Sequence, residues 1–316
     1  MLAFLNALPG AVAQGLIWGI MAIGVYLTYK ILDIADLTVD GSFCTGGAVC
    51  AVLIAAGVNV WLALLCAILA GMLAGLVTGV LHTFCGIPAI LSGILTQLGL
   101  WSVNLAVMGM KSTIAINVTN PEKLDKLLIS MRFLGDVTAG RQPFYRHPIL
   151  VVCLFIALII ALLYWFFGTE LGSSLRATGA NPNMSRAQGI NTDFNKVLGL
   201  ILSNGLVALS GGLLVQYQSN AEINMGRGAI VIGLAAVIIG EVLFGRLFRN
   251  FGLKLLAVAI GAVIYYIVIQ AVLSAGLNPN YLKLLSALVV ALFLSLPYWK
   301  GRYFSKALKK GGGIHA

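Results

Sequence analysis

The amino-acid sequence predicts an all-α integral membrane protein, and its composition and apolar runs lead to that fold class. Of the 316 residues, 60% are hydrophobic and only 9% are charged, whereas a soluble domain carries about 25% charged residues. The 37 glycines favour close contact between helices in a membrane. Runs of about 20 apolar residues, the length that crosses a bilayer, recur along the chain. A water-exposed surface cannot be built from so few charged residues.

Nine apolar runs are candidate membrane spans. The second and the seventh are short and interrupted by glycine, so we expect broken or tilted helices there. The nine runs occupy residues 8–29, 42–58, 60–82, 87–110, 148–167, 195–217, 229–245, 253–275 and 281–298.

A weak internal repeat divides these spans into two halves. Gly15–Gly19 opens a span that leads to Asp40 and a short span, and Asn204-Gly205 opens another that leads to Gly226-Arg227-Gly228 and a second short span. One linking span separates the halves, so the second half is inverted, as is common in transporters. The whole chain, 1–316, is then one transmembrane domain. Its parts are the first half 1–110, a loop 111–147, a linking helix 148–167, a coupling segment 168–194, the second half 195–298 and a basic tail 299–316.

The positive residues predict the orientation of the chain. They gather in three connections that fall on one side when the spans are counted, and an excess of positive charge marks the cytoplasmic side. We therefore expect a multi-pass protein of the bacterial inner membrane, with its N-terminus outside and its C-terminus inside. The net charge of +10 is then a matter of topology, and nucleic-acid binding is not expected. The residues concerned are Arg176 and Arg186, then Arg246, Arg249 and Lys254, and then Lys300, Arg302, Lys306, Lys309 and Lys310.

The long connection at 111–147 lies outside by the same count. It holds six basic and three acidic residues, but a long loop can be translocated despite its charge. Its prolines and glycines suggest a small folded cap or a hairpin.

The polar connection at 168–194 contains signals for a short helix. Asn181 is a favourable N-cap and Pro182 suits the first helical position. Gly189 can adopt the left-handed conformation that ends a helix. The segment is either an ordinary capped connector or a stiff helix on which a partner docks.

The same segment resembles the coupling-helix signature of ABC importer permeases of the branched-chain amino acid and ribose type, which depend on a binding protein. The resemblance rests on residues 175–182 and 186–191, and stretches 19–47 and 233–240 agree with it. It implies that the segment docks on a separate ATP-binding subunit, which binds ATP and Mg in place of this chain. It also implies an extracytoplasmic substrate-binding protein and a homodimeric permease in lipid. The implied coupling residues are Arg176, Gly179, Asn181, Pro182, Arg186, Gly189 and Ile190.

Two departures from the family pattern bear on the solute. The family often has Gly-Gly where this chain has Gly240-Glu241, and residues 37–43 replace its usual turn after the first span. The turn is more similar to a branch of which some members are paired with aromatic amino acid importers. The resemblance therefore implies import of a small polar solute, with an aromatic or branched-chain amino acid ahead of a sugar or a nucleoside.

Several intramembrane polar residues are candidates for a translocation path. Asp40 and Ser42 lie where a span breaks, and either face the solute or belong to a cytoplasmic turn that Asp40 caps. Gln97, Trp101 and Asn104 share one face of a helix, where they either line a path or bond to a neighbouring helix. Asn204 presents the same two alternatives, as do Gln216 and Gln270.

A transporter of another class, driven by an ion gradient, is the competing hypothesis. It would need an ionisable pair in the membrane, for which Asp40 and Glu241 are the candidates. We expect Glu241 to form a structural ion pair with Arg246 or Arg249 rather than a proton relay. The scattered histidines and cysteines predict no catalytic or metal site.

Overall fold

The computed structural model describes residues 2–116, 127–138, 143–245, 247–275, 281, 284, 286–293 and 295, and most of them are helical. Two three-residue strands form the sheet of the described part. In chain order the elements are α1 (Leu2–Tyr26), the π-helix η1 (Leu27–Ile31), α2 (Val39–Ala55), α3 (Val60–Thr83), α4 (Ala89–Val107), β1 (Thr113–Ala115), α6 (Met131–Thr138), the short 3-10 helix η2 (Phe144–Arg146), α7 (Pro148–Gly168), α8 (Glu170–Ala180), α9 (Pro182–Ala187), α10 (Thr192–Gln218), β2 (Asn220–Glu222), α11 (Ala229–Phe244) and α12 (Phe251–Ser274).

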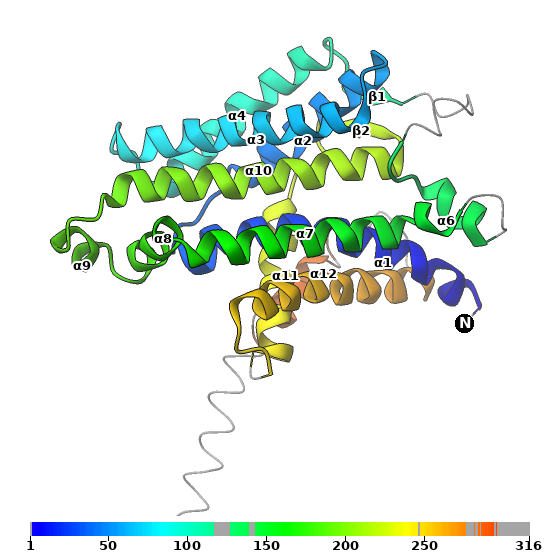
Figure 1. Ribbon diagram of the computed structural model, residues 1–316. Helices are drawn as coiled ribbons and strands as arrows, with labels where there is room; N and C mark the ends of the chain where they lie inside the picture. Colours follow the sequence, from blue (N-terminus) through cyan, green and yellow to red (C-terminus); the bar gives the residue numbers. More distant parts are fainter. Residues whose placement is uncertain are drawn as a thin grey trace, which may run out of the picture.

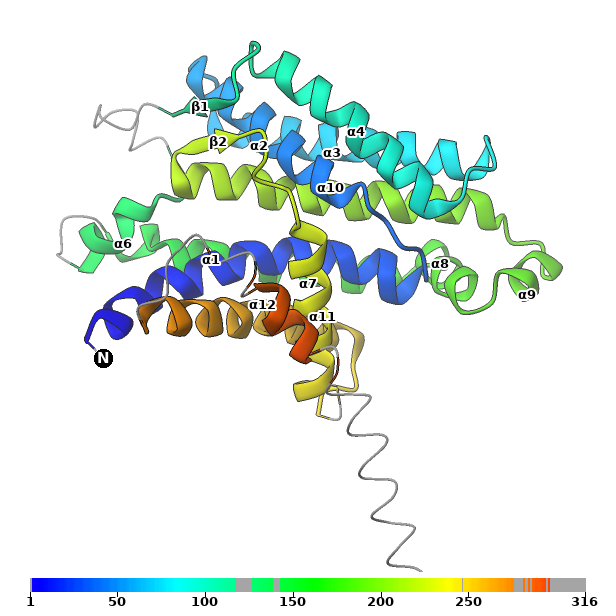
Figure 2. The ribbon, with the colours of Figure 1, turned by 180° about the vertical axis from the view of Figure 1, so that it is seen from behind.

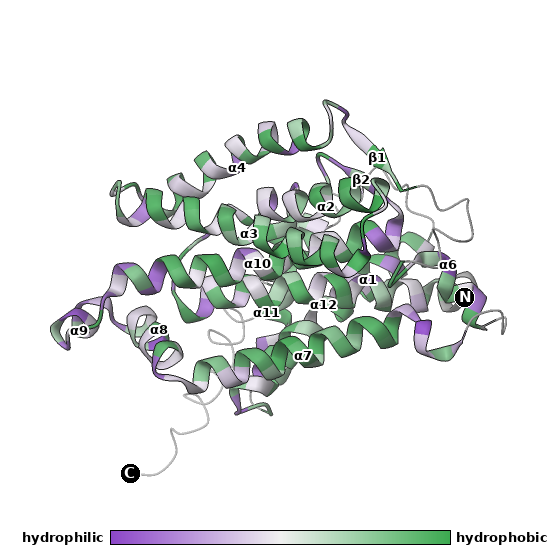
Figure 3. Ribbon diagram, turned by 45° about the horizontal axis from the view of Figure 1, so that its top comes forward, coloured by the Kyte–Doolittle hydropathy of each residue, from purple (hydrophilic) through white to green (hydrophobic). Residues whose placement is uncertain are grey.

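Six helices are long and apolar enough to cross a membrane: α1 with η1, α3, α4, α7, α10 and α12. They run roughly alongside one another (Figure 1). Hydrophobic residues cover the bodies of these helices and hydrophilic residues gather near their ends (Figure 3). An apolar exterior of this kind suits contact with lipid, so the chain is a multi-pass membrane protein.

The second and the seventh predicted spans are short, as expected. They form α2 and α11, with 17 and 16 residues, fewer than the about 20 that a full crossing requires. The chain leaves η1 near α8 and runs back into the bundle before α2 begins, and a second irregular segment leads from β2 to α11 (Figure 2). Both short helices therefore begin inside the bundle.

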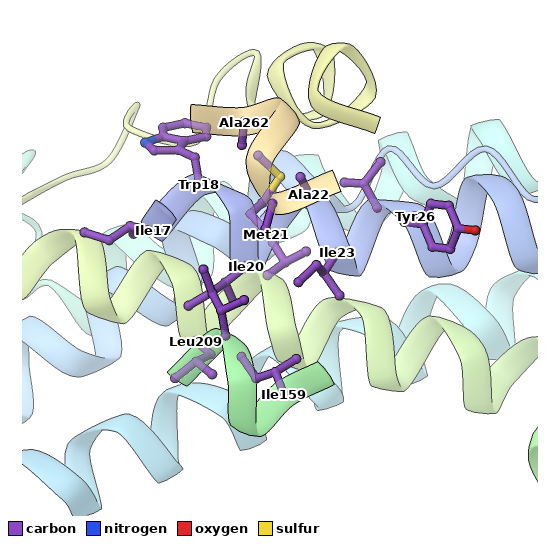
Figure 4. Close-up of a cluster of buried hydrophobic side chains, with 14 of the residues drawn as sticks. Ile17, Trp18, Ile20, Met21, Ala22, Ile23, Tyr26, Ile159, Leu209 and Ala262 are labelled. Carbon is purple, nitrogen blue, oxygen red and sulfur yellow. The ribbon is translucent and has the colours of Figure 1, made fainter. Parts of the chain in front are cut away.

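Helices α1 and α10 form the centre of the bundle. Helix α1 packs against α12, α11 and α10, while α10 packs against α3, α2 and α1. Side chains of α1 point in several directions, towards Ile159 of α7, Leu209 of α10 and Ala262 of α12 (Figure 4). Helices in lipid gain most from such close packing.

Glycines allow the backbones of α2 and α10 to touch. A Cβ atom at Gly46 would overlap the backbone of Ala208, and one at Gly211 would overlap the carbonyl group of Phe43. This tight contact fixes the place of α2 against the central helix, and with it the place of Asp40.

The described part of the long connection, residues 111–116, 127–138 and 143–147, forms a partial cap, one of the two predicted alternatives. Strand β1 pairs antiparallel with β2 of the second half. Helix α6 packs on α1 and α7 and buries Phe133 completely. This cap and the segment α8–α9 lie at opposite ends of the bundle (Figure 1).

Of the ninth predicted span, 281–298, the structure describes residues 281, 284, 286–293 and 295. Within it, residues 286–293 are helical. The basic tail, 299–316, lies outside the described residues.

Candidate translocation site

Asp40 joins the first turn of α2 to the start of α11. Its two carboxylate oxygens accept hydrogen bonds from the backbone N–H groups of Gly228 (2.8 Å) and Ile230 (2.9 Å). The first N–H groups of a helix have no partner within the helix and carry a partial positive charge, so a carboxylate is a favourable acceptor. The interpretation of Asp40 as the cap of a connecting turn is wrong, because Asp40 lies within α2 and caps another helix.

A buried hydrogen-bond network lies beside this contact. The Asp36 carboxylate, 3% exposed, accepts from the backbone N–H of Thr38 (2.9 Å) and from Nδ2 of Asn204 (2.7 Å). Ser42 donates its hydroxyl to Oδ1 of Asn204 (2.6 Å). The two predicted path residues Ser42 and Asn204 are fully buried, so in this structure the network bonds helix to helix.

Replacing Asn204 by leucine is expected to destabilise the fold. The change leaves the Asp36 carboxylate and the Ser42 hydroxyl without their shared partner, and an unsatisfied buried polar group costs about 1–3 kcal/mol. Thermal unfolding of the purified chain in detergent measures the effect. Gln218→Leu is the matched control, because Gln218 is an exposed amide at the end of the same helix; equal unfolding temperatures for the two variants would contradict this role.

The other four predicted path residues line one cavity. Asp40, Gln97, Trp101 and Asn104 surround a volume of about 260 Å³ between α2 and α4, together with Arg227. Asn104 is 1% exposed, and its amide oxygen has no hydrogen-bond partner in the described part of the chain. The sequence prediction that Gln97, Trp101 and Asn104 share a face is confirmed.

A second, larger cavity adjoins the same helix start. It has a volume of about 540 Å³ and is bounded by α1, α11 and α12. Trp18, Tyr265 and Tyr266 supply aromatic surface, and Arg227 lines this cavity as it does the first. The Trp18 ring stacks on Phe43 with centroids 4.8 Å apart, and its indole nitrogen, also buried, has no partner among the described residues.

Arg227, Asp36 and Trp18 were not among the predicted site residues. The position of Arg227 carried a signal: a cation flanked by Gly226 and Gly228 directly precedes an apolar run, and a charge in such a place tends to mark a pathway. Asp36 and Trp18 carried none, because their importance depends on Asn204 and Phe43, which are distant in sequence.

Helix α8 is fastened to three other elements. Nη2 of Arg176 donates to the carbonyl oxygen of Phe167 at the end of α7 (2.6 Å). Asn195 of α10 donates to the hydroxyls of Ser174 (2.6 Å) and Thr178 (2.8 Å). At Gly179, α8 lies so close to η1 that an added Cβ would overlap the Ile31 carbonyl. Helix α8 is therefore held against α7, α10 and η1.

The predicted short helix is present as α9. The side chain of Asn181 accepts a hydrogen bond from the Met184 N–H (3.1 Å), Pro182 is the first helical residue and Gly189 has φ = +81°. The N–H of Ile190 bonds to the Ser185 carbonyl (3.0 Å). The outer surface of this helix is exposed, and Met184 is 57% exposed.

Arg186 ties α9 to the start of α10. Its guanidinium donates to the Thr192 hydroxyl (2.7 Å) and forms an ion pair with Asp193 (3.0 Å). Both members of the ion pair are more than half exposed.

Glu241 forms an ion pair, but with Lys30 rather than with the expected Arg246 or Arg249. Glu241 contacts Lys30 of η1 at 3.1 Å, because α11 crosses the end of α1 where the π-helix places Lys30. Arg246 lies outside the described residues. Arg249 lines, with Lys30, Arg176 and Lys254, a cavity of about 700 Å³ beside the contact of α8 with η1.

Comparison with known proteins shows the family to which the chain belongs. The family model described as "Branched-chain amino acid transport system / permease component" matches residues 8–294. The chain belongs to this permease family. The permease is 38% identical to the tyrosine transport system permease protein of Clostridioides difficile (strain R20291), over 92% of this chain and 91% of that protein.

More distant relatives extend the comparison. The permease is 34% identical to an uncharacterized protein of Rickettsia prowazekii (strain Madrid E), over 92% of this chain and 97% of the relative. It is 25% identical to the ribose import permease protein RbsC of Escherichia coli (strain K12), over 91% of this chain and 84% of that protein. The relatives thus include amino acid and sugar transport subunits, and the family resemblance predicted from the coupling segment is confirmed.

Proposed function

We propose that this permease is the membrane subunit of an ABC importer that moves an amino acid into the cytoplasm. Two copies of the chain form the pathway, an ATP-binding subunit docks below each copy and an extracytoplasmic binding protein delivers the solute. The end of the bundle with α8 and α9 faces the cytoplasm, because it carries Lys30, Arg176, Arg249 and Lys254 and cytoplasmic connections are rich in positive charge. The C-terminus is then inside and the N-terminus outside.

The geometry of α8 and α9 carries this proposal. Helix α9 is capped, short and exposed, whereas α8 is held by α7, α10 and η1. A partner that pushes on α9 therefore moves three membrane helices through α8. A flexible connector would absorb such a push.

The two halves of the permease also suit a transporter with inverted repeats. Helix α1 packs on α12 as α10 packs on α3, and α2 packs on α10 as α11 packs on α1. The pairs correspond if the second half repeats the first around the linking helix α7. Inverted halves of this kind place the solute site near their common axis, where α2 and α11 begin.

An amino acid is the solute that the comparisons favour. The relative named for tyrosine transport shares 38% of its aligned residues with this chain, whereas the ribose relative shares 25%. A related permease with greater identity is the better guide to the solute class.

The proposal is tested by uptake into proteoliposomes that contain the permease, its ATP-binding subunit and the binding protein. We expect uptake of L-tyrosine or L-leucine that requires internal ATP and persists without an ion gradient. Uptake that follows an ion gradient and needs no ATP would instead support the secondary transporter. Copurification of the ATP-binding subunit with the tagged permease is the independent check.

Substitution of Arg186 by glutamine should reduce transport without preventing folding. The ion pair with Asp193 is exposed, and such pairs contribute about 0–1 kcal/mol to stability. Its loss frees α9 from α10, so we expect uptake per ATP hydrolysed to fall at least about fivefold, the lower end of typical coupling between sites. Lys111→Gln, at the other end of the bundle, is the control; an unchanged ratio in Arg186→Gln would count against a coupling role.

A further inference from the structure

Arg227 occupies an unusual position between the two cavities at the start of α11. It lines both of them, and its guanidinium makes no hydrogen bond or ion pair with any described residue. Arg227 is exposed in the single chain, so its guanidinium is accessible to a solute, and a charged residue among apolar membrane helices tends to mark a substrate pathway. The planar guanidinium also matches a carboxylate with two parallel hydrogen bonds.

The smaller cavity presents opposite charges that do not neutralise each other. Asp40 and Arg227 both line it, yet they form no ion pair, because the Asp40 oxygens are directed to the N–H groups of Gly228 and Ile230. Asn104 adds a buried amide oxygen that has no partner among the described residues. An ammonium group fits the acceptors Asp40 and Asn104, and a carboxylate fits Arg227.

The larger cavity has the chemistry of an aromatic side-chain site. Trp18, Tyr265 and Tyr266 offer ring faces, and aromatic pairs gain about 0.5–1.5 kcal/mol beyond simple burial. Gln14 and Gln270 also line it and make no side-chain hydrogen bonds within the described ranges, so they are free to meet a phenolic hydroxyl. Its volume of about 540 Å³ lies within the range of about 300–1,000 Å³ that is usual for ligand sites.

We propose that the two cavities form one site for an aromatic α-amino acid during transport. Arg227 binds the carboxylate, Asp40 and Asn104 receive the ammonium group, and the ring enters the cavity of Trp18, Tyr265 and Tyr266. This inference rests on the proposed function as an amino acid importer. A neutral sugar or nucleoside would bring no charged group to pair with Arg227 or Asp40.

The experiment compares uptake of L-tyrosine, L-leucine and D-ribose by proteoliposomes containing the complete importer. For Arg227→Gln we expect L-tyrosine uptake to fall at least about tenfold, the effect of losing roughly 1.4 kcal/mol of binding free energy. Arg227→Lys keeps the positive charge but loses the bidentate geometry of the guanidinium. Its L-tyrosine uptake should therefore lie between that of the wild type and that of Arg227→Gln. Lys111→Gln is the matched loss of a positive charge outside the site.

A second variant separates binding from folding. Asn104→Leu removes a buried oxygen for which the described part of the chain offers no partner, and replacing polar groups by apolar ones of the same shape can be nearly neutral or stabilising. We expect its unfolding temperature to stay level or rise while L-tyrosine uptake falls, whereas the exposed Gln218→Leu should change neither. If Arg227→Gln fails to insert into the membrane, L-tyrosine uptake by Asn104→Leu still tests the site.

Each alternative outcome overturns a defined part of the proposal. Normal L-tyrosine uptake in Arg227→Gln and Asn104→Leu would reject the site while the importer function stands. Uptake of L-leucine but not L-tyrosine by the wild type would reject the aromatic class. Uptake of D-ribose alone would reject the amino acid function and the site together.

Discussion

Substitution of Gly179 by alanine is expected to uncouple ATP hydrolysis from transport. A single added Cβ would overlap the carbonyl oxygen of Ile31 and crowd Leu32, both of which belong to the backbone and cannot rotate away. Overpacking of this kind costs about 1–3 kcal/mol, so α8 must move off η1. Uptake should then fall at least about tenfold, the change that 1.4 kcal/mol produces, while ATP hydrolysis continues.

The ratio of solute transported to ATP hydrolysed in proteoliposomes measures this effect. Gly168→Ala is the matched control, because Gly168 also lies at a helix end but has open space where its Cβ would be. A wild-type ratio in Gly179→Ala would show that the contact of α8 with η1 does not transmit the movement. If Gly179→Ala no longer accumulates in the membrane, the contact of α8 with η1 is required for folding rather than for coupling.

The long helices were predictable because the cue for each lies within its own residues. The run at 148–167 has no polar interruption, and α7 spans Pro148–Gly168. The coupling segment was equally local: Asn181, Pro182 and Gly189 act on their immediate neighbours through capping and backbone conformation. Short-range physics of this kind can be read from one sequence.

The contacts that build the site were less predictable, because they join residues far apart in sequence. The residue type of Asp40 suggested a cap, but not that the capped helix begins 189 positions later, at Ala229. The partner of Glu241 was missed for the same reason, since Lys30 is 211 residues away. The pairing of β1 with β2 also joins the two halves, and no cue within the loop pointed to it.

Replacement of Asp40 by asparagine should affect both helix α11 and transport. Both carboxylate oxygens accept N–H groups, at Gly228 and Ile230, whereas an asparagine has one oxygen and one donating NH₂ group. One N–H then loses its acceptor and faces another donor, and in the interior of a membrane protein each unsatisfied group costs several kcal/mol. We expect L-tyrosine uptake to fall at least about tenfold.

Hydrogen–deuterium exchange of the peptides that cover residues 228–233 shows the structural effect. Their exchange should accelerate in Asp40→Asn, because the first turn of α11 loses its cap. Asp33→Asn is the control: Asp33 is exposed and has φ = +54°, a conformation that asparagine tolerates. Wild-type exchange and uptake in Asp40→Asn would contradict the role of Asp40 as a cap.

Comparison of Asp40→Asn with Arg227→Gln separates loss of the helix cap from loss of the guanidinium. Arg227 directly precedes Gly228, whose N–H is bonded to Asp40, so loss of the cap also displaces the guanidinium. Arg227→Gln removes the guanidinium but leaves both hydrogen bonds of Asp40 in place. Both variants should therefore lose L-tyrosine uptake, but faster exchange in the first turn of α11 should be confined to Asp40→Asn. Faster exchange in both would mean that Arg227 holds the helix rather than the solute.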